Sequence, residues 1–161
     1  MKIVINSSPL IALSCINQLK LLEKLFDEVI IPQAVYNETV IDGNDKKLDN
    51  EIKQFANLKI LTVMDLRSLE FIIDVLDEGE AEVIALAKEL KINTVVIDEL
   101  KGRKYARKHN LETIGSLGIL VLSKKKGLIN KVAPLMQKMA DHGIRIGDKL
   151  KEEILRKVDE I

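Results

Sequence analysis

The chain of 161 residues predicts an α/β protein, a three-layer α/β/α sandwich around a mainly parallel sheet. Short apolar runs rich in β-branched residues alternate with segments of helical period, and the runs lack the polar alternation of a half-exposed strand. Hydrophobic residues make up 47% of the chain, so one core can form without cross-links. Only three prolines and no Ser/Gly linker predict a single domain over residues 1–161.

The apolar runs place five strands. They are expected at Ile3–Ile5, Val29–Ile31, Ile60–Val63, Thr94–Ile97 and, with a weaker pattern, Thr113–Ile114. In parallel sheets ligands bind beyond the carboxyl ends of the strands, so polar residues directly after these runs are the first candidates for a functional site.

Helical periodicity fills the segments between the strands, and Gly127 and Gly143 are expected to end two of the helices. The helices are expected at Leu10–Ser14, Gln18–Phe26, Gln33–Ile41, Leu48–Ala56, Leu66–Leu76, Glu80–Leu90, Gly102–His109, Leu117–Lys126, Lys131–Ala140 and Asp148–Val158. Residues 42–47 (DGNDKK) are the expected flexible insertion.

Composition excludes several classes of protein. A single cysteine, Cys15, excludes an internal disulfide and fits a reducing cytosol; within the run IALSCI it is expected to be an inert core residue. The 25 basic and 25 acidic residues leave no net charge with which to attract a polyanion over long range. No signal peptide and no apolar stretch near 20 residues is found, so a cytoplasmic protein without a membrane segment is expected.

Four polar residues occupy positions where apolar or capping residues are usual, and two of them follow predicted strands. Asn6 ends the first strand, before Ser7 and Ser8, either of which is a good N-cap, and Pro9, which suits a first helical turn. Asp98 follows the fourth strand, where an N-cap is the structural alternative.

Two glutamates share helix faces with apolar residues. Glu38 lies on the stripe of Ala34, Val35 and Ile41, although the stripe is short and Glu38 could lie at its edge. Glu80 lies on a longer stripe with residues 83, 84, 87 and 90, and the structural alternative is a first-turn acid favoured by the helix dipole. Glu82, on the side of Glu89, is expected to be solvated.

If Asn6, Glu38, Glu80 and Asp98 converge at the sheet edge, the carboxylates of the three acids repel one another and stay ionised only around a cation. Oxygen ligands without His or Cys select Mg²⁺ or Mn²⁺, which can orient a water and neutralise charge on a phosphate. The chemistry indicated is phosphodiester hydrolysis.

Five segments together resemble the PIN-domain superfamily, and most closely its DUF3368 branch: VINSSPLIAL (4–13), VIIPQAVYNE (29–38), LDEGEAEVIALAKEL (76–90), VVIDELKGRKYA (95–106) and IGSLGILVLSKKKGLI (114–129). The resemblance covers roughly residues 1–150 and implies a PIN-like fold. It also implies a metal-dependent ribonuclease, as in the VapC-type toxins of prokaryotic toxin–antitoxin pairs, with RNA as substrate and an antitoxin as partner.

By this resemblance the family's acids correspond to Glu38, Glu80 and Asp98, with Glu99 replacing or assisting Asp98 as a metal ligand. Ser8 matches a small hydroxyl position, and Ser116 would lie near the same edge. The chain departs from the usual pattern at Asn6, where PIN nucleases usually have Asp; Asn keeps one oxygen ligand but loses a negative charge, so metal affinity should fall.

The basic residues after Asp98 are candidates to bind RNA phosphates, although a solvated helix face explains such a run equally well. They are Lys101, Arg103, Lys104 and Arg107. The apolar helix around Leu19–Phe26 could form a homodimer surface or belong to the core. Three readings stay open: a ribonuclease, a catalytically weakened relative that binds RNA or a protein, and an unrelated nucleotide-binding protein. No glycine-rich phosphate loop follows the first strand to support the third.

Overall fold

Five strands form one parallel sheet in the computed structural model, which describes residues 1–161. The strands are β1 (Lys2–Ile5), β2 (Glu28–Pro32), β3 (Leu58–Leu61), β4 (Thr94–Val96) and β5 (Glu112–Ile114). Their order in the sheet is β3-β2-β1-β4-β5, and every neighbouring pair is parallel. All five predicted strands are confirmed, although β3 begins two residues earlier than expected.

Ten α-helices and one π-helix flank the sheet. They are α1 (Ser7–Cys15), α2 (Lys20–Leu25), α3 (Gln33–Tyr36), η1 (Asn37–Ile41), α4 (Lys46–Lys53), α5 (Leu66–Ile73), α6 (Glu78–Glu89), α7 (Leu100–Lys108), α8 (Ser116–Lys125), α9 (Ala133–Asp141) and α10 (Asp148–Lys157). Gly127 and Gly143 follow α8 and α9 with positive φ, as predicted. None of these helices has the length and hydrophobicity that crossing a bilayer requires.

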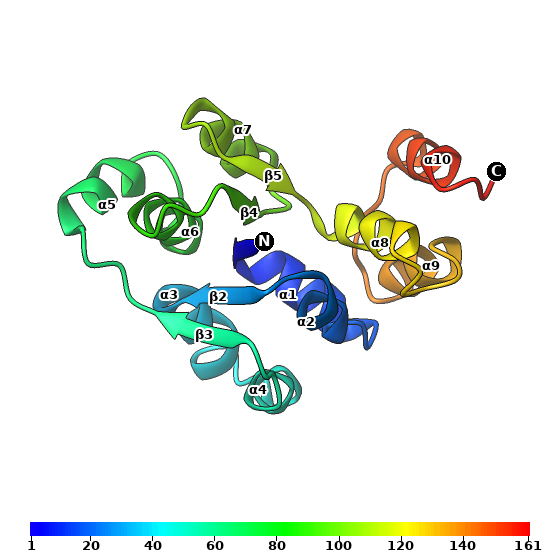
Figure 1. Cartoon of the computed structure of the whole chain (residues 1–161), viewed down its shortest axis with the longest axis horizontal. Helices are drawn as coiled ribbons and strands as arrows, with labels where there is room; N and C mark the ends of the chain where they lie inside the picture. Colours follow the sequence, from blue (N-terminus) through cyan, green and yellow to red (C-terminus); the bar gives the residue numbers. More distant parts are fainter.

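The helices form two layers around the sheet, so the predicted α/β/α architecture is confirmed. On one side α6 packs across β1, β2 and β4 with α5 beside it, and α7 packs against β5. On the other side α1 packs against α4 and α8, while α2 contacts β2 and α8 (Figure 1). Because both faces are covered, the central strand β1 is fully buried at Ile3, Val4 and Ile5.

The predicted helix Gln33–Ile41 is not a regular α-helix. After α3 the chain widens into the π-helix η1, and the backbone N–H of Asp42 donates to the carbonyl of Asn37, five residues earlier, at 2.7 Å. The wider turn rotates the later residues, so Ile41 is 59% exposed rather than part of an apolar stripe. The predicted stripe is therefore wrong at Ile41, because it assumed an α-helical period.

The apolar residues proposed as a homodimer surface are part of the core. Leu19, Leu21, Leu22 and Phe26 are each at most 4% exposed and belong to one cluster of 41 buried residues. Cys15 packs against this cluster, and burial raises the pKa of its thiol. A free thiol with a raised pKa is a poor nucleophile, which fits the expected inert role.

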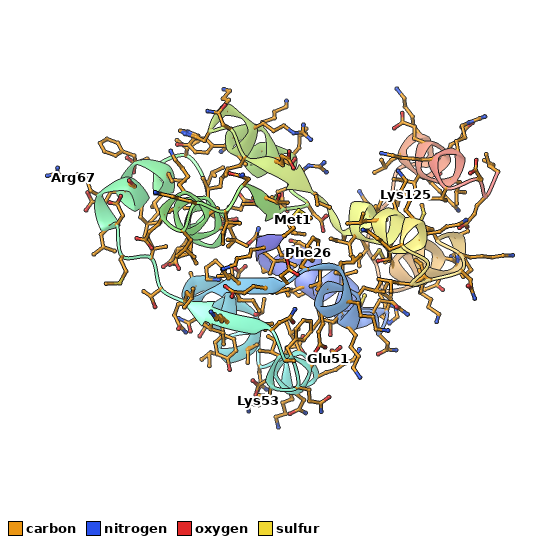
Figure 2. The ribbon with its side chains drawn as sticks, in the orientation of Figure 1. Met1, Phe26, Glu51, Lys53, Arg67 and Lys125 are labelled. Carbon is orange, nitrogen blue, oxygen red and sulfur yellow. The ribbon has the colours of Figure 1, made fainter.

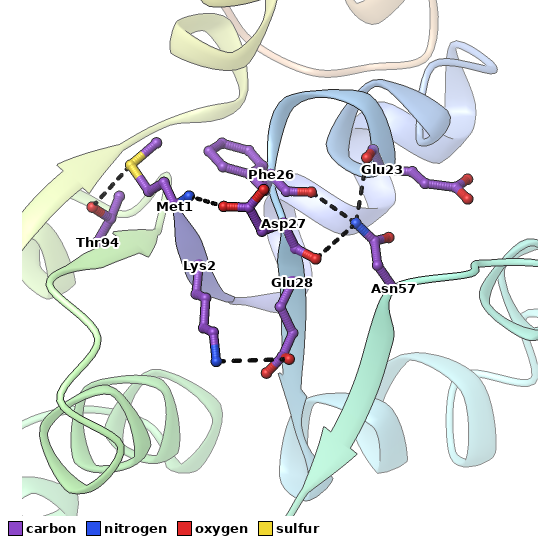
Figure 3. A network of polar contacts seen from close by, with 8 residues as sticks. All are labelled: Met1, Lys2, Glu23, Phe26, Asp27, Glu28, Asn57 and Thr94. Carbon is purple, nitrogen blue, oxygen red and sulfur yellow. Dashed lines mark hydrogen bonds and ion pairs between the residues drawn. The ribbon is translucent and has the colours of Figure 1, made fainter.

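Side-chain contacts cross-link the amino ends of the strands (Figure 3). The Met1 ammonium pairs with the Asp27 carboxylate, and the Asn57 side chain donates to the carbonyl oxygens of Phe26, at 2.7 Å, and Glu23, at 3.3 Å. These contacts tie the start of β1 to the start of β2 and to the residue before β3. The predicted site residues lie at the opposite, carboxyl edge of the sheet.

Candidate active site at the carboxyl edge of the sheet

Asn6 presents an unpaired oxygen at the end of the central strand. Its backbone N–H continues the sheet by donating to the Val96 carbonyl at 3.0 Å. Asn6 occupies the N-cap position of α1, but its side chain forms no capping hydrogen bond. The residue is 3% exposed, and its Oδ1 has no hydrogen-bond partner. A buried acceptor without a partner destabilises the folded chain unless something binds it, so Oδ1 is a candidate ligand atom.

Glu38 lies beside Asn6. A Cβ atom at Gly79 would lie 3.0 Å from Glu38 Oε2 and 3.3 Å from Asn6 Oδ1, so both oxygens border the space that the missing side chain leaves. Burial first, and then the charge of Asp77, raise the pKa of Glu38, while a hydrogen bond from the Ser7 hydroxyl opposes the rise. The π-helix thus turns this carboxylate toward the end of β1, although the residue as a whole is exposed.

Glu80 is the most perturbed acid in the chain. It is 5% exposed, and its backbone N–H donates at 2.8 Å to Asp77, the N-cap of α6. Burial, followed by the charges of Asp77, Glu99 and Glu38, raises the pKa of Glu80 to about 7. The inward direction predicted for Glu80 is confirmed. A carboxylate that gains or loses its proton near neutral pH beside other acids is typical of a functional site.

Asp98 is held in a different way. Its Oδ1 accepts hydrogen bonds from the backbone N–H and the hydroxyl of Ser116, at 2.6 and 3.1 Å, so the carboxylate is anchored at the first turn of α8. It is not an N-cap, because Glu99 occupies that position of α7. The guanidinium of Arg103 adjoins the carboxylate, since a Cβ at Gly115 would lie 2.9 Å from Asp98 Oδ1 and 3.2 Å from an Arg103 terminal nitrogen.

The predicted metal ligands therefore form two neighbouring groups at one edge of the sheet. Asn6, Glu38 and Glu80 form the first, and Asp98 with Ser116 forms the second, while Glu99 acts on Glu80 through its charge. No three Asp, Glu, His or Cys side chains lie close enough together to hold a metal ion by themselves. The assignment of all five residues to one centre stays a prediction.

Two details of the predicted site differ in the structure. The hydroxyl beside Glu38 is that of Ser7, which is 8% exposed, whereas Ser8 makes no hydrogen bond to a site acid. Neither serine is the N-cap of α1, since both lie inside the helix. Asp77 was missed, although the spacing of Asp77 and Glu80 at the start of a helix is a capping signal.

Glu82 was expected to be solvated, and this expectation is wrong. Glu82 is 9% exposed, and its carboxylate accepts from the backbone N–H of Ala34, in the first turn of α3, at 3.2 Å. Helix periodicity could not reveal this contact, because the partner lies 48 residues away. Glu89, on the same side, accepts from the backbone N–H of Asp65 at 2.6 Å. Both acids position a neighbouring helix and lie outside the candidate site.

The predicted phosphate-binding residues differ in their surroundings. Arg103 is partly buried and makes no ion pair within salt-bridge distance; burial and then the charge of Arg107 lower its pKa, while Asp98 opposes the change. Arg107 instead donates from Nε to the Thr113 hydroxyl at 3.1 Å. Lys101 and Lys104 are exposed. Arg103 is thus the cation best placed to meet an anion beside Asp98.

The first group fits a hard divalent cation. Its donors are carboxylate and amide oxygens, which Mg²⁺ and Mn²⁺ prefer. Its Asn6 Oδ1 lacks a partner, and the charge of Glu38 contributes, after burial and the charges of Asp77 and Glu99, to the raised pKa of Glu80. A cation among them would give Asn6 Oδ1 a partner and would remove the repulsion between the carboxylates of Glu38 and Glu80.

Comparison with known proteins identifies the family. No curated protein matches the chain. The family model DUF3368, described as a PIN domain, matches residues 2–160, nearly the whole chain. PIN domains are generally nucleases, and they typically use divalent metal ions. The parallel sheet, the acids at its carboxyl edge and this match agree, and the chain belongs to the DUF3368 family of PIN domains.

Proposed function

We propose that the protein is an Mg²⁺- or Mn²⁺-dependent endoribonuclease of the cytoplasm. The observation that carries this proposal is the unpaired Asn6 Oδ1 beside Glu38, next to an acid, Glu80, whose pKa is about 7. The Asn6 oxygen has no hydrogen-bond donor, and the carboxylates of Glu38 and Glu80 have no counter-ion. A hard cation would bind the oxygen and neutralise the carboxylates.

Asn6, Glu38 and Glu80 would hold the cation, and Asp98 and Glu99 would complete the site from the neighbouring strand. When bound, the metal supplies a polarised water and neutralises charge on the phosphate. Without the cation the pKa of Glu80 is raised to about 7, and a cation bound there would lower this pKa and keep the carboxylate ionised as a ligand. Ser116 fixes the Asp98 carboxylate from the first turn of α8.

The substrate would be held by its backbone phosphates. Arg103, beside Asp98 and without an ion pair, is suited to bind the phosphate next to the cleaved bond. Lys101, Lys104 and Arg107 lie on the same helix as Arg103 and would contact neighbouring phosphates. The chain has no Trp and only five other aromatic residues, Tyr and Phe together, so base stacking would contribute little.

The biological role proposed is that of the toxin in a toxin–antitoxin pair. Its partner would be an antitoxin encoded beside it, and a homodimer would use a surface other than the buried apolar residues of α2. Expression of the protein alone should then arrest growth, and expression together with the neighbouring small reading frame should restore growth.

A catalytically weakened PIN domain that binds RNA or a protein is the second candidate. Asn6, where these nucleases usually have Asp, favours it, because the amide brings one negative charge fewer to the cation. Under this reading the site acids still perturb one another, but the protein cleaves RNA slowly or not at all.

An RNA-cleavage assay with Mg²⁺ and with Mn²⁺ separates the two candidates. The variants are Glu80→Gln and Asp98→Asn, with Glu112→Gln, an exposed acid at the amino edge, as the matched control. The nuclease proposal expects Glu80→Gln and Asp98→Asn to lower the rate on the order of 100-fold and the control to have no effect. Wild-type protein that binds RNA without cleaving it would favour the second candidate.

A further inference from the structure

A cavity of about 550 Å³ lies beside Asp98, and none of Asn6, Glu38 and Glu80 lines it. Its lining includes Asp98, Arg103 and Ser116, together with residues of α8, α9 and α10. In Figure 1 these three helices gather at the end of the molecule that holds the C-terminus, and α10 contacts α8. The cavity is therefore continuous with the candidate active site.

The charges in the lining of the cavity are almost all positive. Its cations are Arg103, Lys125, Arg145 and Lys157, and its only carboxylate is that of Asp98. None of the four cations forms a salt bridge within the chain. The chain carries no net charge, so four unpaired cations around one cavity form a local concentration of positive charge.

Nine of the 18 residues that line the cavity are hydrophobic. They include Leu117 and Val121 of α8 and Ile146 in the segment before α10. Basic and apolar side chains in one lining match the two parts of a nucleotide, because the phosphates need cations and the faces of the bases are apolar.

We propose that this cavity holds the single strand of RNA on one side of the cleaved phosphate, with its phosphates on Lys125, Arg145 and Lys157. The proposal rests on the proposed function, since the strand leads to the acids at Asp98. An acidic helix of a protein partner would match the same charges. Continuity with the site favours RNA, because Asp98, Arg103 and Ser116 belong both to the candidate active site and to the lining of the cavity.

A small number of contacts fix the end of α10, the helix that contributes Lys157 to the lining of the cavity. No residue within α10 is buried, but Glu160, just beyond it, accepts from the backbone N–H groups of Val132 and Ala133 at 2.6 and 2.8 Å and pairs with Lys124 at 2.9 Å. These contacts tie the end of α10 to the end of α8 and the start of α9. The helix α10, which carries Lys157, is therefore part of the folded structure.

Binding of fluorescein-labelled single-stranded RNA of mixed sequence, ~12 nucleotides long, tests the proposal by anisotropy in EDTA, where no cleavage occurs. The test variant is Lys125→Glu with Arg145→Glu; Lys125 is labelled on α8 in Figure 2. The matched control is Lys46→Glu with Lys91→Glu, which reverses two exposed charges outside the cavity. Thermal melts check that both variants fold.

The test variant should bind RNA at least about tenfold more weakly, and the slope of log K against log salt should fall by about 1 to 2. The control should match wild type. Equal RNA affinity in the test variant overturns the proposal, as does a cavity that binds an acidic helical peptide while RNA binds elsewhere. If Glu80→Gln loses cleavage while Lys125→Glu/Arg145→Glu binds RNA as wild type does, the nuclease proposal stands and only RNA binding in this cavity is refuted.

Discussion

Gly102 lies directly against Glu80. A Cβ atom at Gly102 would lie 3.2 Å from both Cδ and Oε2 of Glu80 and 3.1 Å from Cγ2 of Ile97. Gly79 stands in the same relation to Glu38, and Gly115 to Asp98. Each of the three acids of the candidate site therefore rests against a glycine, and the absence of a side chain there allows the carboxylate to occupy its place.

Replacing Gly102 with Ala should displace the Glu80 carboxylate. We expect the variant to lose about 1–3 kcal/mol of unfolding free energy through overpacking, partly offset by the better helix propensity of Ala. The stabilisation by Mn²⁺ should shrink, measured as the difference in Tm with and without the ion. In Gly147→Ala, whose added Cβ meets no atom within 4 Å, the Mn²⁺ shift should stay as in wild type. An unchanged shift in Gly102→Ala would contradict a role of Gly102 in placing Glu80.

The stability of the protein in EDTA should fall as the pH rises through the range between 4.5 and about 7. The folded state keeps a proton on Glu80 in this range that the unfolded chain has released, so ionisation favours unfolding. The loss should be on the order of 3 kcal/mol between pH 5 and pH 8. Glu80→Gln should remove most of this dependence in urea titrations at several pH values, whereas Glu112→Gln should retain it. A flat profile in wild type would show that Glu80 titrates normally.

Replacing Asn6 with Asp should have opposite effects with and without metal. In EDTA the variant should be less stable than wild type, because a further buried acid joins Glu38 and Glu80. In Mn²⁺ it should be stabilised more, and each tenfold gain in affinity adds about 1.4 kcal/mol when the ion is in excess. Isothermal titration calorimetry measures the affinity directly. Asn93→Asp adds the same charge at the exposed amino edge and should leave metal binding unchanged. Weaker Mn²⁺ binding by Asn6→Asp would exclude Asn6 as a ligand.

Replacing Glu160 with Gln should loosen α10. Although burial raises the pKa of Glu160, its hydrogen bonds with Lys124, Val132 and Ala133 outweigh burial and lower it below the usual value. This contribution to stability is present above the unfolded-state pKa and disappears as the pH falls through the lower folded-state pKa. We expect a loss of about 1–3 kcal/mol at neutral pH and faster hydrogen exchange in α10. Glu153→Gln, an exposed acid of α10 without a hydrogen bond, is the control. Unchanged exchange in Glu160→Gln would show that other contacts hold α10.

The sequence predicts the sheet well because its signals are local. The central strands β1, β2 and β4 contain buried runs of β-branched residues, and the helix that carries Glu80 has an apolar stripe whose members Val83 and Ile84 are fully buried. The direction of Glu80 follows from that stripe. Asn6 and Asp98 are found because they directly follow buried strands, which places them at one edge of any parallel sheet.

The parts that were missed depend on contacts between distant segments or on an irregular backbone. The burial of Glu82 requires the first turn of α3, and the anchor of Asp98 requires Ser116 of α8. No periodicity within one helix contains either partner. The π-helix at Glu38 was missed because Asn37–Ile41 has no proline or glycine to mark an irregular turn. Ser8 was chosen from the family resemblance, and the contact of Ser7 with Glu38 could not be predicted because Glu38 lies 31 residues away on another helix.

The π-helix also affects how this chain is compared with its relatives. A turn closed by a bond from Asp42 back to Asn37 contains one residue more than an ordinary helical turn. A relative with a regular helix here would therefore align with this chain only if a one-residue gap is opened within η1. Because Glu38 lies within η1, an ungapped alignment could pair it with the wrong residue of such a relative. The equivalent acid should therefore be found by superposition of the two structures.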